Sequence, residues 1–153
     1  MKHSAIINWS KSPAELFTDN KYGRAHQWRF DGGATFLASS SPEVVPIPFS
    51  DETAIDPEEA FIAAIASCHM LFFLSIAASR RYVVTSYEDH VEGIMANNEQ
   101  GKMAMIKIVL RPQIHFTGTP VPTPREIALM HESAHDRCFL ANSVNSVIEI
   151  ISN

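Results

Sequence analysis

The longest apolar run of the chain covers residues 60–78 and contains no formally charged side chain. A run of this length predicts either a membrane span or a helix that is buried on all sides. The alanines before Cys68 and the polar side chains of Ser67, His69 and Ser75 make the run only weakly lipophilic. We therefore interpret it as the central helix of a soluble protein. A chain of 153 residues can hardly surround one such helix, so we expect a second copy to cover it in an obligate homodimer.

The residues before this run predict where the helix begins. Asp56 suits the N-cap, Pro57 the first helical position and Glu59 the third, which together form a capping arrangement. Arg80 and Arg81 suit the C-terminal end, where the helix dipole favours positive charge. The sequence predicts one long, unbroken helix between these two ends.

Upstream of the helix, the pattern of apolar and polar positions favours strands. Residues 5–9, 25–30 and 34–39 are predicted as three antiparallel strands, with Asp31-Gly32-Gly33 as a tight turn between the last two. Residues 40–55 contain three prolines, which remove backbone donors and predict an extended loop.

Downstream of the helix, residues 82–96 and 102–116 are predicted as two long strands joined by a turn at residues 97–101. Thr123 and Glu126 predict the capping box of a second helix that ends near Cys138. A last strand is predicted at residues 146–151. Strands that are segregated from helices are typical of the α+β class. We expect antiparallel sheets around a long central helix, in one domain over residues 1–153.

The formal net charge of −5 provides no basic surface for nucleic acid. The N-terminal residues lack the apolar core and cleavage site of a secretory signal, which favours a cytoplasmic location. Permanent disulfides are disfavoured there, so Cys68 and Cys138 are expected to be free, redox-active or metal-bound.

Cys68 lies in the middle of the apolar helix, where a thiol is normally inert. It becomes reactive when a nearby cation stabilises the thiolate and a second thiol, here Cys138, accepts the oxidised sulfur. Arg24 is a candidate for the cation, and Glu58 is a candidate for holding its guanidinium through a bidentate bond. The alternative interpretation is that the cysteines are small core side chains and that Arg24 and Glu58 are solvated surface charges.

Another candidate site is the H-E-x-x-H pattern of His131 and His135, which predicts a zinc-dependent hydrolase with Glu132 as the base. A variant of this site uses His131, His135 and Cys138 as three ligands on one helix face. His131 and Cys138 also fit the buried stripe of an amphipathic helix, which would carry the second thiol into the core. A non-catalytic, stress-related ligand-binding protein with an apolar cavity is a further alternative.

The chain nevertheless resembles one known family over nearly its whole length. Asp56-Pro-Glu-Glu-Ala-Phe, the sequence Ala-Ala-Ile-Ala-Ser before Cys68, and Ala-His-Asp-Arg before Cys138 are similar to the osmotically inducible and organic hydroperoxide resistance (OsmC/Ohr) proteins. An upstream Gly23-Arg24 followed by Asp31-Gly32 matches the same pattern.

The resemblance implies an intertwined α+β homodimer that acts as a thiol-dependent peroxidase on organic hydroperoxides. Cys68 would be the peroxidatic cysteine, Cys138 the resolving one, and Arg24 with Glu58 the activating pair. The sequence shows no Gly-rich dinucleotide loop, so we expect no cofactor, and electrons must come from an external dithiol, which is a dihydrolipoyl group in the organic hydroperoxide branch. We assign no residue to a metal site, and the sequence leaves open whether His131, His135 and Cys138 bind a metal. Phe139 and His69 follow the two cysteines where many relatives have proline and an aromatic residue, which leaves the branch open.

The positions of Glu58 and Cys68 set a geometric condition. Ten residues on one straight helix correspond to about 15 Å along its axis, so the two side chains cannot share a site within that helix. We expect Glu58 to serve Cys68 of the partner subunit.

Overall fold

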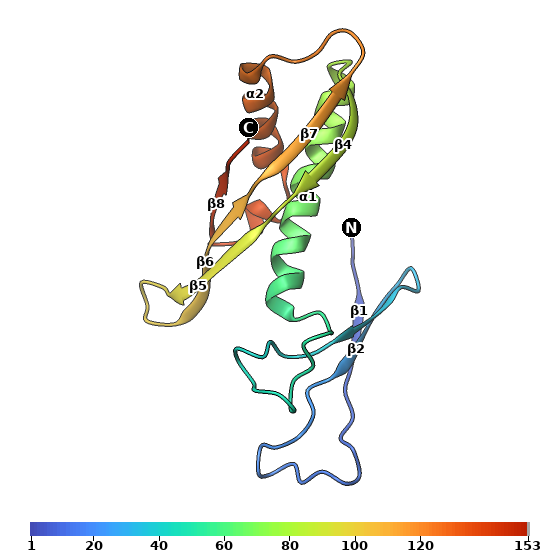
Figure 1. Cartoon of the computed structure of the whole chain (residues 1–153), viewed down its shortest axis with the longest axis vertical. Coiled ribbons are helices and arrows are strands. Elements are labelled where there is room, and N and C mark those ends of the chain that lie inside the picture. The colour runs from blue at the N-terminus through green and yellow to red at the C-terminus, as the bar shows by residue number, and fades with distance from the viewer. Residues whose placement is uncertain (153) are drawn as a thin grey trace. The chain divides into compact units, whose positions relative to one another are not determined.

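A computed structural model describes residues 1–152, and it confirms the α+β class. Figure 1 shows the elements in chain order. They are β1 (Ala5–Asn8), β2 (His26–Phe30), β3 (Thr35–Ala38), α1 (Pro57–Ser79), β4 (Val83–Asp89), β5 (Glu92–Asn97), β6 (Met103–Leu110), β7 (Pro112–Thr117), α2 (Pro124–Arg137), the short 3₁₀ helix η1 (Ala141–Ser143) and β8 (Val147–Ile150). The chain divides into two compact units, Met1–Ala60 and Phe61–Asn153, which are described separately. The sequence-based expectation of a single domain stays a prediction.

The first unit contains the antiparallel sheet β1–β2–β3, as the sequence predicts. Its turn at Asp31-Gly32-Gly33 places Gly33 at a φ of +88°, a conformation that side chains disfavour. Large apolar side chains remain exposed along the sheet, including Ile6, Ile7 and Leu37. The sheet therefore lacks an apolar cover within the first unit.

The long helix α1 begins as its capping residues predict. The backbone N–H of Glu59 donates to Asp56 Oδ1 at 2.7 Å, and the N–H of Asp56 donates to Glu59 Oε2 at 3.4 Å, which closes the capping box. The helix continues without interruption to Ser79. Glu58 and Cys68 therefore lie about 15 Å apart along one axis, as the spacing requires.

Within one chain, α1 is only partly covered. Ile65, His69, Phe73 and Ile76 are buried, whereas Leu71 on another face is 61% exposed. The helix has the length and apolar composition of a membrane span, with 28% of its most apolar window buried. A core helix that a second subunit covers has the same length, apolar composition and partial burial within its own chain.

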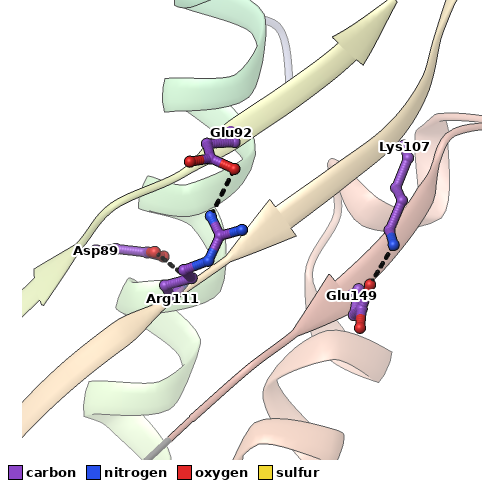
Figure 2. Close-up of polar contacts among 5 residues, drawn as sticks. All are labelled: Asp89, Glu92, Lys107, Arg111 and Glu149. Carbon is purple, nitrogen blue, oxygen red and sulfur yellow. Dashed lines mark hydrogen bonds and ion pairs between the residues drawn. The ribbon is translucent and has the colours of Figure 1, made fainter.

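The strands of the second unit are shorter than the sequence predicts. Each of the two expected long strands is interrupted, so that β4 pairs with β7 and β5 pairs with β6 in separate sheets. At the interruption, the backbone N–H of Arg111 donates to Asp89 Oδ1 at 2.7 Å, and the Arg111 guanidinium pairs with Glu92 at 2.8 Å. Figure 2 shows Arg111 between these two carboxylates. Pro112 follows and has no N–H to donate, so a continuous ladder cannot form.

The strand β8 pairs with β6 in parallel, an arrangement that the sequence does not predict. An ion pair between Lys107 on β6 and Glu149 on β8 joins the two strands on one side (Figure 2). The parallel strand covers the end of β6, where Ile108, Val109 and Leu110 are all buried.

The helix α2 begins at the capping box of Thr123 and Glu126, as predicted, and Cys138 is its C-cap. Met130 and Ala134 of α2 pack against Phe73, Ile76 and Ala77 of α1 in one buried cluster. A second cluster joins the earlier turns of α1 to β6 through Ile65, Ala66, Ile108 and Leu110. These two clusters position the part of α1 that carries Cys68.

Candidate functional site

The structure brings Cys68 and Cys138 together. Cys68 lies near the middle of α1 and is partly exposed, whereas Cys138 at the end of α2 is completely buried. The side chain of Cys68 is close enough to the thiol of Cys138 to raise its pKa, so the two thiols are neighbours. The backbone N–H of Cys138 donates to Ala134 O at 2.9 Å, which keeps this residue attached to the last turn of its helix.

The surroundings of Cys138 keep its thiol protonated. Burial raises the pKa of Cys138, and the neighbouring side chain of Cys68 raises it further. The backbone N–H of Ala141 opposes this effect by donating to Cys138 Sγ at 3.4 Å. The thiol of Cys138 is therefore a weaker acid than an ordinary cysteine thiol.

The apolar surroundings that the sequence predicts for Cys68 are only partly confirmed. Ile65 and Phe73 are buried, and Phe72 packs edge-on against Phe139 with ring centroids 5.2 Å apart. Phe61, by contrast, is 36% exposed. Of the four apolar side chains expected around Cys68, two are therefore buried, and Phe61 is the most exposed.

Arg24 and Glu58 line one cavity of about 460 Å³ in the first unit. Most of its wall is apolar or aromatic, formed by Ile7, Trp9, Phe17, Tyr22 and Pro57. The guanidinium of Arg24 lies over the ring of Tyr22 at 3.7 Å and donates to Asn20 Oδ1 at 2.8 Å. No ion pair joins Arg24 to Glu58 within residues 1–152, so the expected bidentate bond is not formed in the single chain.

The backbone N–H and C=O groups of Gly23 and Arg24 all form hydrogen bonds. The N–H of Gly23 donates to Glu15 Oε1 at 2.9 Å, and Trp9 Nε1 donates to the Gly23 carbonyl at 2.8 Å. The N–H of Arg24 donates to Phe49 O at 2.9 Å, and its carbonyl accepts a hydrogen bond from His26 Nδ1 at 2.8 Å. These contacts fix the position from which the guanidinium extends.

Sequence reasoning did not identify Trp9, Glu15 and His26 as parts of this site. A signal exists for His26, because Trp28 lies on the same face of β2 and donates its Nε1–H to His26 Nε2 at 2.9 Å. This bond leaves His26 Nδ1 as the protonated nitrogen, which then donates to Arg24.

The two histidines of the H-E-x-x-H pattern have a different environment from a zinc site. His131 is buried, and its Nδ1 lies 2.9 Å from Nε2 of His69 on α1. Within the described part of the chain, no group of three His, Cys, Asp or Glu side chains is arranged to hold a metal ion. The structure thus supports the buried-stripe interpretation of α2 rather than the hydrolase.

Comparisons with known proteins agree with this fold. The family model described as OsmC-like protein matches residues 50–153. No curated protein matches the sequence.

Three solved structures illustrate the range of similarity. An OsmC-like protein of unknown function from Vibrio cholerae is 53% identical, with a TM-score of 0.98 over 100% of this chain and 99% of that chain. An organic hydroperoxide resistance protein from Elizabethkingia anophelis has a TM-score of 0.70 at 17% identity, over 99% of this chain and 94% of that chain. The organic hydroperoxide resistance protein OhrB of Bacillus subtilis has a TM-score of 0.70 at 15% identity, over 100% of this chain and 98% of that chain. The last two likenesses concern the fold alone, and together with the family model and the Vibrio protein they lead to one conclusion: the chain belongs to the OsmC-like family.

Proposed function

We propose that this protein is a thiol-dependent peroxidase that reduces organic hydroperoxides. The observation that carries the proposal is the contact between Cys68, which is partly exposed, and Cys138, which is buried and keeps its proton. Family membership supports it, since two of the similar folds are named organic hydroperoxide resistance proteins. A thiol that is accessible beside one that is protected is the arrangement that a two-cysteine peroxidase needs.

The chemistry begins with the thiolate of Cys68. Its sulfur attacks the distal peroxide oxygen, so that an S–O bond forms, the O–O bond breaks and the departing alkoxide takes a proton to become an alcohol. Cys68 is thereby oxidised to a sulfenic acid. The sulfur of Cys138 then attacks the sulfur of this sulfenic acid, a disulfide forms and water leaves. An external dithiol reduces the disulfide by exchange and restores both thiols.

The cavity in the first unit provides the other half of the proposed site. An arginine is always charged and can hold a peroxide oxygen, and the aromatic and aliphatic wall around Arg24 favours an apolar substituent on the peroxide. In this proposal Glu58 orients Arg24 once the site is complete. The preferred substrate is then an alkyl or aryl hydroperoxide rather than hydrogen peroxide.

A second copy of the chain completes the proposed enzyme. The exposed apolar side chains of α1, such as Leu71, and those of the β1–β2–β3 sheet, such as Ile6 and Ile7, need a cover. We propose an intertwined homodimer in the cytoplasm, reduced by a lipoyl-type or similar dithiol.

The direct test is a peroxide consumption assay with cumene hydroperoxide and a small dithiol. The wild-type protein should turn over, and Cys68→Ser should lose at least about a thousandfold in rate because it lacks the nucleophile. Cys138→Ser should consume about one peroxide per chain and then slow down, because its sulfenic acid has no internal partner. Equal turnover by Cys68→Ser and wild type would exclude the peroxidase. Stoichiometric zinc in the purified protein, measured by elemental analysis, would favour the hydrolase instead.

A further inference from the structure

The proposed reaction uses the two thiols but not the buried histidines beside them. His69 follows Cys68 on α1 and is 1% exposed, and His131 lies two turns before Cys138 on α2 and is 3% exposed. Their ring nitrogens are 2.9 Å apart. Within residues 1–152 this is the only hydrogen bond that joins α1 to α2.

The geometry of the two rings is that of a well-aligned hydrogen bond. The ring planes differ by 9° and the centroids lie 5.2 Å apart, while the two bonded nitrogens are separated by 2.9 Å. Both nitrogens therefore lie between the ring centres, and the rings meet edge to edge. The N–H of one ring then points along the lone pair of the other, which makes the bond sensitive to sliding of one helix past the other.

The second ring nitrogen of His131, Nε2, indicates which of the two histidines donates the hydrogen bond. This nitrogen is buried and has no hydrogen-bond partner among the described residues. A buried acceptor without a partner is less costly than a buried N–H without one. We therefore assign the shared proton to His131 Nδ1, which donates to His69 Nε2.

Packing alone does not require two imidazoles at these positions. His131 contacts the ring of Phe73 at a centroid distance of 4.4 Å, and Phe73 itself belongs to the buried apolar cluster that contains Met130 and Ala134. An apolar ring would fill the same space without the cost of burying polar nitrogens. Buried polar pairs of this kind contribute little net stability, and their best-attested use is to fix the register of two helices.

We propose that the His69–His131 hydrogen bond fixes the register of α1 against α2 and thereby holds the sulfurs of Cys68 and Cys138 within reach of each other. The two histidines are positioning residues, because they act on the thiols through the helices and contact neither substrate nor sulfur. The inference rests on the proposed use of the two cysteines as a redox pair.

The test measures how readily the two thiols form their disulfide. Wild-type protein and variants are equilibrated with mixtures of reduced and oxidised dithiothreitol, and the disulfide fraction is determined by alkylation and mass spectrometry. In His131→Phe the equilibrium constant should fall about tenfold, which corresponds to about 30 mV. His69→Phe and the double variant should show the same loss, because each removes one and the same bond.

Two further variants make the result specific. His131→Asn keeps an N–H donor near the position of Nδ1 and should retain the wild-type equilibrium constant to within about threefold. His115→Phe changes an exposed histidine on β7 and should have no effect. A folded His131→Phe with a wild-type equilibrium constant, or a folded His131→Asn with a tenfold loss, overturns the inference.

The outcome also separates the inference from the proposed function. If wild-type protein forms no Cys68–Cys138 disulfide, both the redox pair and the inference fail. If it forms the disulfide and His131→Phe forms it equally well, only the positioning role fails. If the phenylalanine variants do not fold, His131→Asn decides between the two results.

Discussion

The two cysteines differ in the properties that a peroxidatic and a resolving thiol need. Cys68 is partly exposed in the middle of a helix, where a substrate can approach it. Cys138 is completely buried, and burial together with the neighbouring Cys68 raises its pKa. In the proposed reaction the buried thiol is protected from peroxide and reacts only after the accessible thiol has been oxidised.

This division of roles predicts the product of oxidation. One equivalent of organic hydroperoxide should convert wild-type protein into an intramolecular Cys68–Cys138 disulfide, because the two thiols are already neighbours within one chain. Peptide mapping under non-reducing conditions detects it. Cys138→Ser should instead accumulate a sulfenic acid on Cys68 that a dimedone probe captures. Bridges formed only between chains would contradict the two-cysteine mechanism.

The buried histidine pair predicts how stability depends on pH. Burial lowers the pKa of His69 to about 4, assisted by His131 and His135, and burial lowers the pKa of His131 to about 4. In the unfolded chain both groups titrate near pH 6.5, so the unfolded state binds protons first as the pH falls. The stability that the protein gains from keeping both histidines neutral is fully present above pH 6.5. It is lost as the pH falls towards 4.

Urea denaturation at pH 7, 5.5 and 4 measures this effect. The free energy of unfolding should fall by roughly 3–6 kcal/mol between pH 7 and pH 4, which is the range from one protonated histidine to two. The double variant His69→Phe/His131→Phe should lose correspondingly less over the same range, because it carries no buried imidazole there. Parallel pH profiles for wild type and double variant would mean that the histidines are not the cause.

At the scale of elements, the sequence predicts the features that depend on local chemistry. The capping boxes at Asp56 and Thr123, the turn at Gly33 and the helical position of both cysteines follow from residue types and short spacings. Pro112 is a local signal for the break in the second long strand that the sequence-based prediction did not use. The other cause of the break, the Asp89 carboxylate that accepts the backbone N–H of Arg111 from another strand, has no such signal. The same holds for the contact between His69 and His131, which are 62 residues apart. Contacts between distant segments leave no periodic signal in the sequence.

One element contact depends on a glycine. A Cβ atom at Gly93 on β5 would lie 2.9 Å from Ile62 Cγ2 on α1 and 2.5 Å from Met105 Sδ on β6. The helix and the two strands approach closely at this point, which leaves no room for a side chain.

Gly93→Ala should therefore destabilise the protein by about 1–3 kcal/mol, since the branched side chain of Ile62 must shift even if Met105 moves aside. Chemical denaturation measures the change. Gly32→Ala is the matched control, because a Cβ atom there meets nothing within 4 Å, and its stability should stay within about 0.5 kcal/mol of wild type. An unchanged stability of Gly93→Ala would show that the contact relaxes without cost.

At the scale of the whole molecule, a single chain leaves too much apolar surface exposed. Ile7 in the first unit is 59% exposed and Leu71 on α1 is 61% exposed. The sequence anticipates the second of these, because the helix is apolar on every side, but it does not reveal the uncovered sheet. Both surfaces support the proposed homodimer. The uninterrupted helix determines which chain contributes which residues to each active site. Glu58 and Cys68 are about 15 Å apart on α1, so we propose that Arg24 and Glu58 of one chain serve Cys68 of the other.

Mixed dimers test this composition. Glu58→Ala chains are combined with Cys68→Ser chains, each inactive as a homodimer, and heterodimers are isolated with two different affinity tags. If the sites are shared, one of the two sites in each heterodimer contains both an intact Glu58 and an intact Cys68, so activity should return to about half that of a wild-type dimer.

The control combines Cys68→Ser with Cys138→Ser. Because Cys68 and Cys138 are in contact within one chain, no site in that heterodimer contains both thiols, and sustained turnover should not return. Heterodimers of Glu58→Ala and Cys68→Ser that stay inactive would mean that each site belongs to a single chain, and recovery in the control would mean that the thiols pair between chains.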